Sequence, residues 1–243
     1  MDRFFVDSRI EKTAFITDKD EIKHISKVLR LREDDEVEIF SNEEREFIAK
    51  IVNISKDQIE LEILEEVKKK RELDCKITIY QGIPKGQKME LIVQKATELG
   101  VYRVVPCNFK RCVSSISEKE DKKISRWQKI AQEASKQSKR LKVLTVANVM
   151  EMKDVVKDLK NNDINILFYE AEEEHSLKDY IRSLDSEKIT SVGIIVGAEG
   201  GLEEDECEEF VSAGAKIVTL GDRILRTETA AVYGAAILSY EFE

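Results

Sequence analysis

The chain has 243 residues, 42% of them hydrophobic and 37% charged, which allows a sizeable buried core and excludes an intrinsically disordered protein. No apolar run approaches the roughly 20 residues of a membrane-spanning helix, and the first residues lack a secretory signal, so we expect a cytoplasmic protein that does not enter a membrane. The four cysteines form no CxxC pair and neither histidine lies near one, so we expect no metal site and no disulfides.

The net charge of −9 is distributed unevenly along the chain. Residues 103–142 hold 12 Lys and Arg against 4 Asp and Glu, whereas residues 150–243 hold 9 against 22. Because salt screens charges over roughly 8 Å at physiological ionic strength, the basic stretch can act independently of the acidic one. The pattern favours a basic RNA-contact strip beside an acidic region with another task, with an ordinary solvated helix face as the alternative.

Residues 1–66 favour a small antiparallel β-barrel. Strands with one buried and one solvated face are indicated by alternation of apolar and polar residues at 36–40, 46–53 and 58–64. Shorter extended runs are expected at 3–7 and 14–17, and a helix at 20–29. The charged run 65–72 is expected to be a solvated linker.

From residue 73 onward, strands alternate with helices, which implies a mostly parallel sheet covered on both faces. The predicted strands are 76–81, 103–106, 164–169, 191–197 and 216–220. The predicted helices are 88–99, 125–140, 150–159, 177–184, 204–213 and 227–242. We expect the helix 125–140 to carry a basic face made by Lys129, Lys136, Lys139 and Arg140. The chain is therefore predicted to form two domains, 1–72 and 73–243.

A buried strand runs directly into the turn Gly197-Ala198-Glu199-Gly200-Gly201. Glycines allow a backbone to approach a ligand closely, and in open α/β sheets ligands bind beyond the carboxyl ends of strands. The sequence is neither a dinucleotide fingerprint nor a P-loop, and the acidic residues 203–206 that follow would repel a phosphate at this helix start. The turn favours a ligand without phosphates, with a plain tight turn as the alternative.

A second strand ends at a glycine in the segment from Leu220 to Ala230, where a short loop leads into a helix with Thr227 as a candidate N-cap. That helix is rich in small residues, namely Ala230, Ala231, Gly234, Ala235 and Ala236. Such residues permit close packing, either in a buried helix or in a subunit interface.

Several segments together carry a specific signature: residues 3–6, 28–32, 85–101, 126–140, 197–201 and, most specific of all, 220–230 with its Arg226-Thr227-Glu228-Thr229-Ala230 sequence. On these segments the chain resembles the ribosomal RNA small subunit methyltransferase E family, the 16S rRNA uridine-N3 methyltransferases of the knotted SPOUT superfamily. Ala198 stands where the family usually has proline. Because alanine can adopt the backbone angles of proline, we expect a looser turn and intact function.

The resemblance implies a PUA-like RNA-binding β-barrel followed by a SPOUT-type α/β domain, whose mostly parallel sheet is threaded into a trefoil knot. It implies S-adenosylmethionine as the cofactor, 16S rRNA or the small ribosomal subunit as the substrate, and a homodimer. By position, it assigns cofactor binding to Tyr169, Gly197, Glu199, Gly200, Gly201, Leu220, Gly221, Ile224, Leu225, Arg226 and Thr227.

Uridine N3 carries a proton at neutral pH, so its methylation needs a base, a cationic group that stabilises the anion, or both. We expect Arg226 to stabilise the anion and Glu228 to act as the base; alternatively, the two only cap the last helix or pair with each other. Since N3 lies on the Watson–Crick edge, the uridine must be unpaired or flipped out. RNA contacts are expected from Arg3, His24, Arg30, Arg32, Lys85, Lys88, Arg111, Arg126 and Arg140.

Three other functions stay open on the sequence alone. They are the same fold acting on another base or another RNA, a non-catalytic RNA-binding assembly factor, and a nucleotide-binding α/β enzyme. The acidic helix start at residues 203–206 disfavours the last of these.

Overall fold

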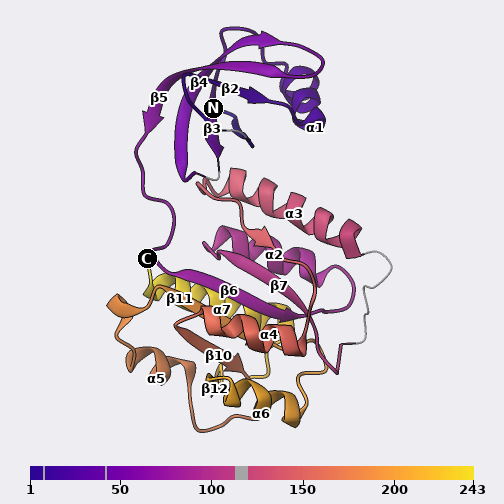
Figure 1. Cartoon of the computed structure of the whole chain (residues 1–243), viewed down its shortest axis with the longest axis vertical. Coiled ribbons are helices and arrows are strands. Elements are labelled where there is room, and N and C mark those ends of the chain that lie inside the picture. Colours follow the sequence, from indigo (N-terminus) through magenta and orange to yellow (C-terminus); the bar gives the residue numbers. More distant parts are fainter. Residues whose placement is uncertain (8, 42, 113–119) are drawn as a thin grey trace. The chain divides into compact units, whose positions relative to one another are not determined.

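The computed structural model describes residues 1–7, 9–41, 43–112 and 120–243 (Figure 1). The chain forms two compact units, and neither is a single stretch of sequence. The first unit contains residues Met1–Glu72 and Ser135–Val143, and the second contains Leu73–Ala134 and Leu144–Glu243. The segment 135–143 thus belongs structurally with the N-terminal residues, although its neighbours on both sides along the chain belong to the second unit.

The first unit is built on a curled five-stranded sheet in the order β1-β3-β4-β5-β2 (Figure 1). Its strands are β1 (Arg3–Phe5), β2 (Thr13–Ile16), β3 (Glu36–Ser41), β4 (Arg45–Ile54) and β5 (Ile59–Val67). The apolar residues that alternate along β3, β4 and β5 form its buried core, as predicted. The linker prediction is wrong for residues 65–67, because β5 continues through them and pairs Glu65 with Ile48 and Val67 with Glu46.

The helix predicted at residues 20–29 is present but has two parts. A short helix α1 (Lys19–Lys23) begins at Asp18, whose carboxylate accepts the backbone N–H groups of Asp20 and Glu21. It continues as the π-helix η1 (His24–Leu29), which ends at Arg30 in the left-handed conformation with φ +57°. The wider π turn is often found at functional sites and is not distinguishable from an α-helix by hydrophobic period over so few residues.

The second unit has a seven-stranded parallel sheet in the order β12-β10-β11-β6-β7-β8, with β9 also paired to β7. Its strands are β6 (Lys76–Gly82), β7 (Arg103–Asn108), β8 (Thr145–Val146), β9 (Met150–Glu151), β10 (Ile164–Phe168), β11 (Ser191–Val196) and β12 (Ala215–Val218). Six α-helices belong wholly or mainly to its described residues: α2 (Lys88–Glu98), α3 (Glu120–Gln137), α4 (Met152–Asp158), α5 (Leu177–Arg182), α6 (Glu204–Ser212) and α7 (Thr227–Glu241). The predicted alternation of strands and helices is confirmed, except that β8 and β9 were not predicted and residues 150–151, expected to begin a helix, form β9 because they pair with β7.

Helices cover the parallel sheet on both faces. Helix α7 packs against β6 and β11 beside α2, whereas α4 packs against β7 and α6. All residues of β6 after Lys76 are buried, as expected of a central parallel strand. Two 3₁₀ turns, Leu159–Asn161 and Ser186–Lys188, complete the unit. None of the helices in the described ranges is long and apolar enough to cross a bilayer.

The basic face predicted for residues 125–140 is only partly present. Helix α3 ends at Gln137, and Lys139 lies beyond it with φ +61°. Arg140 is buried and forms an ion pair with Glu72 at 2.5 Å. Lys136 is largely covered and pairs with Glu21. Lys136 and Arg140 thus form ion pairs within the first unit, because the end of α3 packs against that unit and does not face solvent.

Candidate functional site

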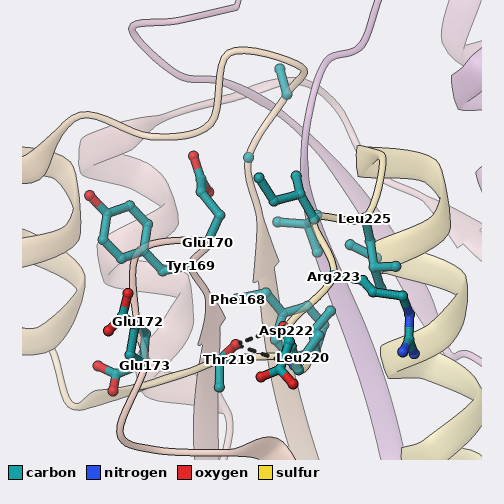
Figure 2. Close-up of a pocket in the computed structure, with 16 residues that line it drawn as sticks. Phe168, Tyr169, Glu170, Glu172, Glu173, Thr219, Leu220, Asp222, Arg223 and Leu225 are labelled. Atoms are coloured by element: carbon teal, nitrogen blue, oxygen red, sulfur yellow. Dashed lines mark hydrogen bonds between the residues drawn. The ribbon is translucent and has the colours of Figure 1, made fainter.

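A cavity of about 500 Å³ lies at the carboxyl ends of β10, β11 and β12 (Figure 2). Its walls are the loop after β10, the start of the turn after β11, the loop after β12 and Ala230 of α7. Parallel strands end at one edge of their sheet, so three loops distant in sequence converge here. The charged residues that line it are Glu170, Glu172, Glu173, Asp222 and Arg223. Four carboxylates against one guanidinium favour a ligand that carries positive charge over one that carries phosphates.

One of these carboxylates is held in place by its own loop. Glu172 Oε1 accepts the backbone N–H groups of Glu174 and His175, each at 2.8 Å, and lies 3.1 Å from His175 Nδ1. These hydrogen bonds from His175 and Glu174 lower the pKa of Glu172. The loop therefore presents an ionised carboxylate to the cavity.

The glycine turn after β11 is tight enough to exclude side chains at two of its positions. The Gly201 N–H donates to the Ala198 carbonyl at 3.0 Å, and Gly201 has φ +71°, which favours glycine. A Cβ on Gly197 would lie 2.8 to 3.0 Å from backbone atoms of Gly201. The glycines are thus needed by the turn itself, and Gly197 and Ala198 also line the cavity.

Hydrogen bonds from three other elements fix this turn. The Gly197 carbonyl accepts the Thr227 hydroxyl at 2.6 Å and the Gln81 amide at 3.4 Å. The Gly200 carbonyl accepts Arg111 Nη1 at 3.0 Å. The wall of the cavity is therefore held from β6, α7 and the segment after β7. Gln81 was not singled out from the sequence, because a single polar residue at a strand end has no distinctive pattern.

Glu199 points to α2 and joins a charged cluster with Lys88 and Glu228. Lys88 Nζ lies 2.9 Å from Glu199 Oε1 and 3.4 Å from Glu228 Oε2, and the Lys85 N–H donates to Glu199 at 3.0 Å. Burial alone would raise the pKa of Glu199, but the hydrogen bonds from Lys88 and from backbone N–H groups outweigh it and lower the pKa. One cluster thus contains a residue predicted to bind the cofactor (Glu199), two predicted to contact RNA (Lys85 and Lys88) and the predicted base (Glu228).

Arg226 and Glu228 do not pair with each other. Arg226 stands at the N-cap of α7, is exposed and makes no side-chain capping hydrogen bond. Among the described residues its guanidinium forms no hydrogen bond or ion pair. Glu228 is only 13% exposed and its ion pair is with Lys88, while its Oε2 atom has no hydrogen-bond partner in the described part of the chain. Among the described residues no contact joins the two, so the pairing alternative has no support, whereas the acidic Glu228 does lie in the first turn of α7, where a carboxylate favours a helix N-terminus.

The residues predicted to bind a cofactor fall into two groups. The group that lines the cavity consists of Tyr169, Gly197, Leu220, Gly221, Ile224 and Leu225. The other group lies next to the cavity without lining it and consists of Glu199, Gly200, Gly201, Arg226 and Thr227. Within the first group, Gly221 has φ +109°, a conformation that favours glycine, and the Ile224 side chain is 87% exposed.

Six of the residues predicted to contact RNA lie at the surface. His24, Arg30 and Arg32 are exposed on and just after the π-helix of the first unit. In the second unit Lys85, Arg111 and Arg126 are exposed, and Arg126 pairs with Glu90 at 2.9 Å.

Arg111 and the remaining three residues have internal partners. Arg3 is buried, donates to the Ser135 and Arg140 carbonyls at 3.2 and 2.8 Å, and pairs with Glu46. Arg140 is buried against Glu72. Arg111 is held by Glu203 at 2.9 Å, and Lys88 belongs to the charged cluster. Arg3 and Arg140 do not belong to the exposed residues predicted to contact RNA, because their guanidinium groups are buried in the first unit.

Two family models match the chain. The first is described as an RNA methyltransferase domain and covers residues 71–239. The second is described as an RNA methyltransferase PUA domain and covers residues 16–64, within the curled sheet of the first unit, which is therefore a PUA-like half-barrel.

The chain is also similar to known proteins over almost its whole length. It is 34% identical to ribosomal RNA small subunit methyltransferase E of Bacillus subtilis, covering 100% of this chain and 98% of the relative. The enzyme of the same name from Buchnera aphidicola is 32% identical, covering 99% and 93%. Among solved structures, a ribosomal RNA small subunit methyltransferase E from Neisseria gonorrhoeae bound to S-adenosyl methionine matches with a TM-score of 0.87 and 28% identity, covering 99% and 97%.

Proposed function

Because this chain belongs to the ribosomal RNA small subunit methyltransferase E family, we propose that it transfers a methyl group from S-adenosylmethionine to N3 of one uridine in 16S rRNA of the small ribosomal subunit. The observation that carries this proposal is the cavity formed where β10, β11 and β12 end. We also propose the functional division of the chain into an RNA-binding part at 1–72 and a catalytic part at 73–243, with residues 135–143 contributed to the first part.

The residues around the cavity fit this cofactor. Its volume of about 500 Å³ lies in the range of small-molecule sites. The four carboxylates that line it complement a sulfonium and an ammonium group, and the left-handed Gly221, with no atom within 4 Å of an added Cβ, leaves backbone open to a ligand. When bound there, S-adenosylmethionine supplies a methyl group that is already activated by its sulfonium. We propose from the family membership that the cavity lies in a trefoil knot.

The reaction then needs two things from the protein. Glu228 accepts the proton of N3, and the charge that spreads onto O2 and O4 of the uracil is stabilised by Arg226. N3 forms its bond to the methyl carbon as the bond from that carbon to sulfur breaks, so alignment of the two partners is the main task of the site. Arg226 has no hydrogen bond or ion pair from its side chain within the described ranges and Glu228 is held by Lys88, which suits a cation that can move and a fixed base.

We propose that the surface formed by His24, Arg30 and Arg32 contacts RNA phosphates. Replacing both arginines with alanine is expected to lower the slope of the logarithm of RNA affinity against the logarithm of salt concentration by about two units, since each phosphate contact contributes roughly one. The measurement is RNA binding by fluorescence anisotropy over a salt series. Arg45→Ala is the matched control, because Arg45 lies in the same unit but pairs with Glu66. An unchanged slope in the double variant would exclude this surface.

We further propose a homodimer formed through the exposed face of α7. Tyr233 and Tyr240 are exposed seven residues apart on one face of this helix, Tyr240 at 84%, and Leu91 is exposed on the adjoining helix α2. Tyr233→Glu is expected to convert a dimer to a monomer in sedimentation equilibrium. Val211→Glu, on the exposed side of α6, is expected to leave the dimer intact. A wild-type protein that sediments as a monomer would contradict the proposal.

The decisive test is a modification map of 16S rRNA. We expect mass spectrometry to find an N3-methyluridine in cells that carry the gene and not in a deletion strain, with the modification restored by the wild-type gene. A lost methyl group on another base or another RNA would identify a different substrate for the same fold. Unchanged rRNA, together with no binding of S-adenosylhomocysteine in calorimetry, would indicate a non-catalytic RNA-binding factor.

A further inference from the structure

A buried hydrogen-bonded group joins β6, the turn after β11 and α7. The amide nitrogen of Gln81 donates to the Thr227 hydroxyl oxygen at 2.8 Å, and the Thr227 hydroxyl donates to the Gly197 carbonyl at 2.6 Å. Gln81 is fully buried and Thr227 almost so. The same amide also donates to the Gly82 carbonyl at 2.9 Å. Three segments that are far apart in sequence therefore meet at two polar side chains.

Close backbone packing fixes where Gln81 lies. Gln81 is the register partner of Val196, the residue before Gly197. A Cβ on Gly82 would lie 2.6 Å from the Ala198 nitrogen and 3.0 Å from the Gly197 carbonyl carbon, so the end of β6 and the turn are in direct contact. The Gln81 side chain thus leaves β6 at a point that cannot shift without moving the turn.

The first residue of α7 depends on this group for its position. Arg226 at the N-cap makes no side-chain capping hydrogen bond, so the start of the helix lacks the usual cap. Thr227, the next residue, is attached instead to Gln81 and Gly197. Arg226 and Glu228 flank Thr227 in sequence, and their placement against the cavity therefore follows from its contacts.

We propose that Gln81 and Thr227 are positioning residues for methyl transfer, which hold Arg226 and Glu228 against the wall of the cavity at Gly197. The inference rests on the proposed function. A stabilising role alone does not explain Gln81, since its Oε1 atom is buried without a hydrogen-bond partner among the described residues, and an apolar side chain would avoid this unfavourable burial. The amide N–H groups of Gln81 instead set the position of the Thr227 hydroxyl.

The test compares Thr227→Val with Thr227→Ser in single-turnover and steady-state methylation of small-subunit RNA. Valine keeps the shape and removes the hydroxyl, and serine keeps the hydroxyl. We expect the valine variant to lose about 10- to 100-fold in kcat, the size of effect that a misplacement of about 1 Å can produce, with little change in KM for S-adenosylmethionine. We expect the serine variant to recover most of this loss. Thermal unfolding of each variant shows whether it is folded.

Gln81→Glu adds a readout that a merely structural role would not move. A protonated glutamic acid can donate to Thr227, whereas a carboxylate cannot. The kcat of this variant relative to wild type is therefore expected to fall as pH rises, within the range where unfolding curves show a folded protein. If Thr227→Val fails to fold, the pH dependence of kcat in Gln81→Glu still tests the positioning role.

The outcomes separate this inference from the proposed function. A wild-type protein without methyl transfer overturns the proposed function. An active wild type with valine and serine variants of equal kcat, or with a pH-independent ratio for Gln81→Glu, overturns the positioning role and leaves the function standing.

Discussion

An Arg226→Ala variant is expected to bind S-adenosylmethionine as tightly as the wild type and to methylate RNA about 10² to 10³ times more slowly, the usual loss when one preorganised donor is removed from a developing anion. The reason is the position of this arginine. It is exposed at the N-cap of α7, it does not line the cavity, and among the described residues no carboxylate holds it. Its charge is thus available to a substrate group and contributes little to the folded protein alone.

The measurement separates binding from chemistry, with calorimetry for the cofactor and single-turnover kinetics for the transfer. Arg182→Ala on α5 serves as the control, because it also removes one exposed arginine from the second unit. Wild-type turnover in Arg226→Ala would remove this residue from the mechanism. A fall in cofactor affinity as large as the fall in rate would instead make Arg226 a cofactor contact.

Gly197→Ala is expected to weaken cofactor binding by about 10- to 100-fold. The new methyl group would lie 2.8 to 3.0 Å from the backbone of Gly201, closer than real Cβ contacts allow. The turn cannot move aside freely, because Thr227 holds one of its carbonyls and Arg111 holds another. Overpacking of this kind costs roughly 1 to 3 kcal/mol, and about 1.4 kcal/mol corresponds to a factor of ten in affinity. We expect this free-energy cost to appear as weaker cofactor binding, because the turn lines the cavity.

Gly214→Ala is the control for the general effect of placing alanine at a glycine. Gly214 has φ +95°, so alanine is strained there, but no atom lies within 4 Å of the added Cβ and the residue does not line the cavity. This variant should lose stability in thermal unfolding and keep its affinity in calorimetry. Normal affinity in Gly197→Ala would show that the turn can open without disturbing the cavity wall.

Local patterns in the sequence predicted most of the strands and helices and the edge of the sheet where the cavity lies, but not the two-residue strands β8 and β9. Alternation in residues 36–64 and the strand–helix repeat after residue 73 depend only on residues close together in sequence. They can therefore be recognised without knowing which distant segments pack against them. The glycines at 197 and 221 mark strand ends, and both line the cavity. Their assignment to one shared ligand site came from the family resemblance, because the glycine turn alone also fits a plain tight turn.

Contacts between distant segments could not be predicted in this way. Arg3 looks like a surface cation in sequence, yet its acceptors lie more than 130 positions away in the segment 135–143. Arg111 similarly meets Glu203, and Gln81 meets Thr227. Period and composition report which face of an element is apolar, but not which carbonyl or carboxylate a long side chain reaches. The linker and the basic helix face were misjudged for the same reason, since both depend on pairing partners.

The assignment of residues 135–143 to the first unit has a consequence for how the molecule can move and be divided. The polypeptide passes between the units three times, after Glu72, after Ala134 and after Val143, and the second passage falls inside helix α3. A rotation of one unit against the other must be absorbed at all three passages together, one of them a continuous helix. A fragment that stops at residue 72 would likewise lack the carbonyl acceptors of Arg3, so residues 1–72 are not expected to form a detachable module.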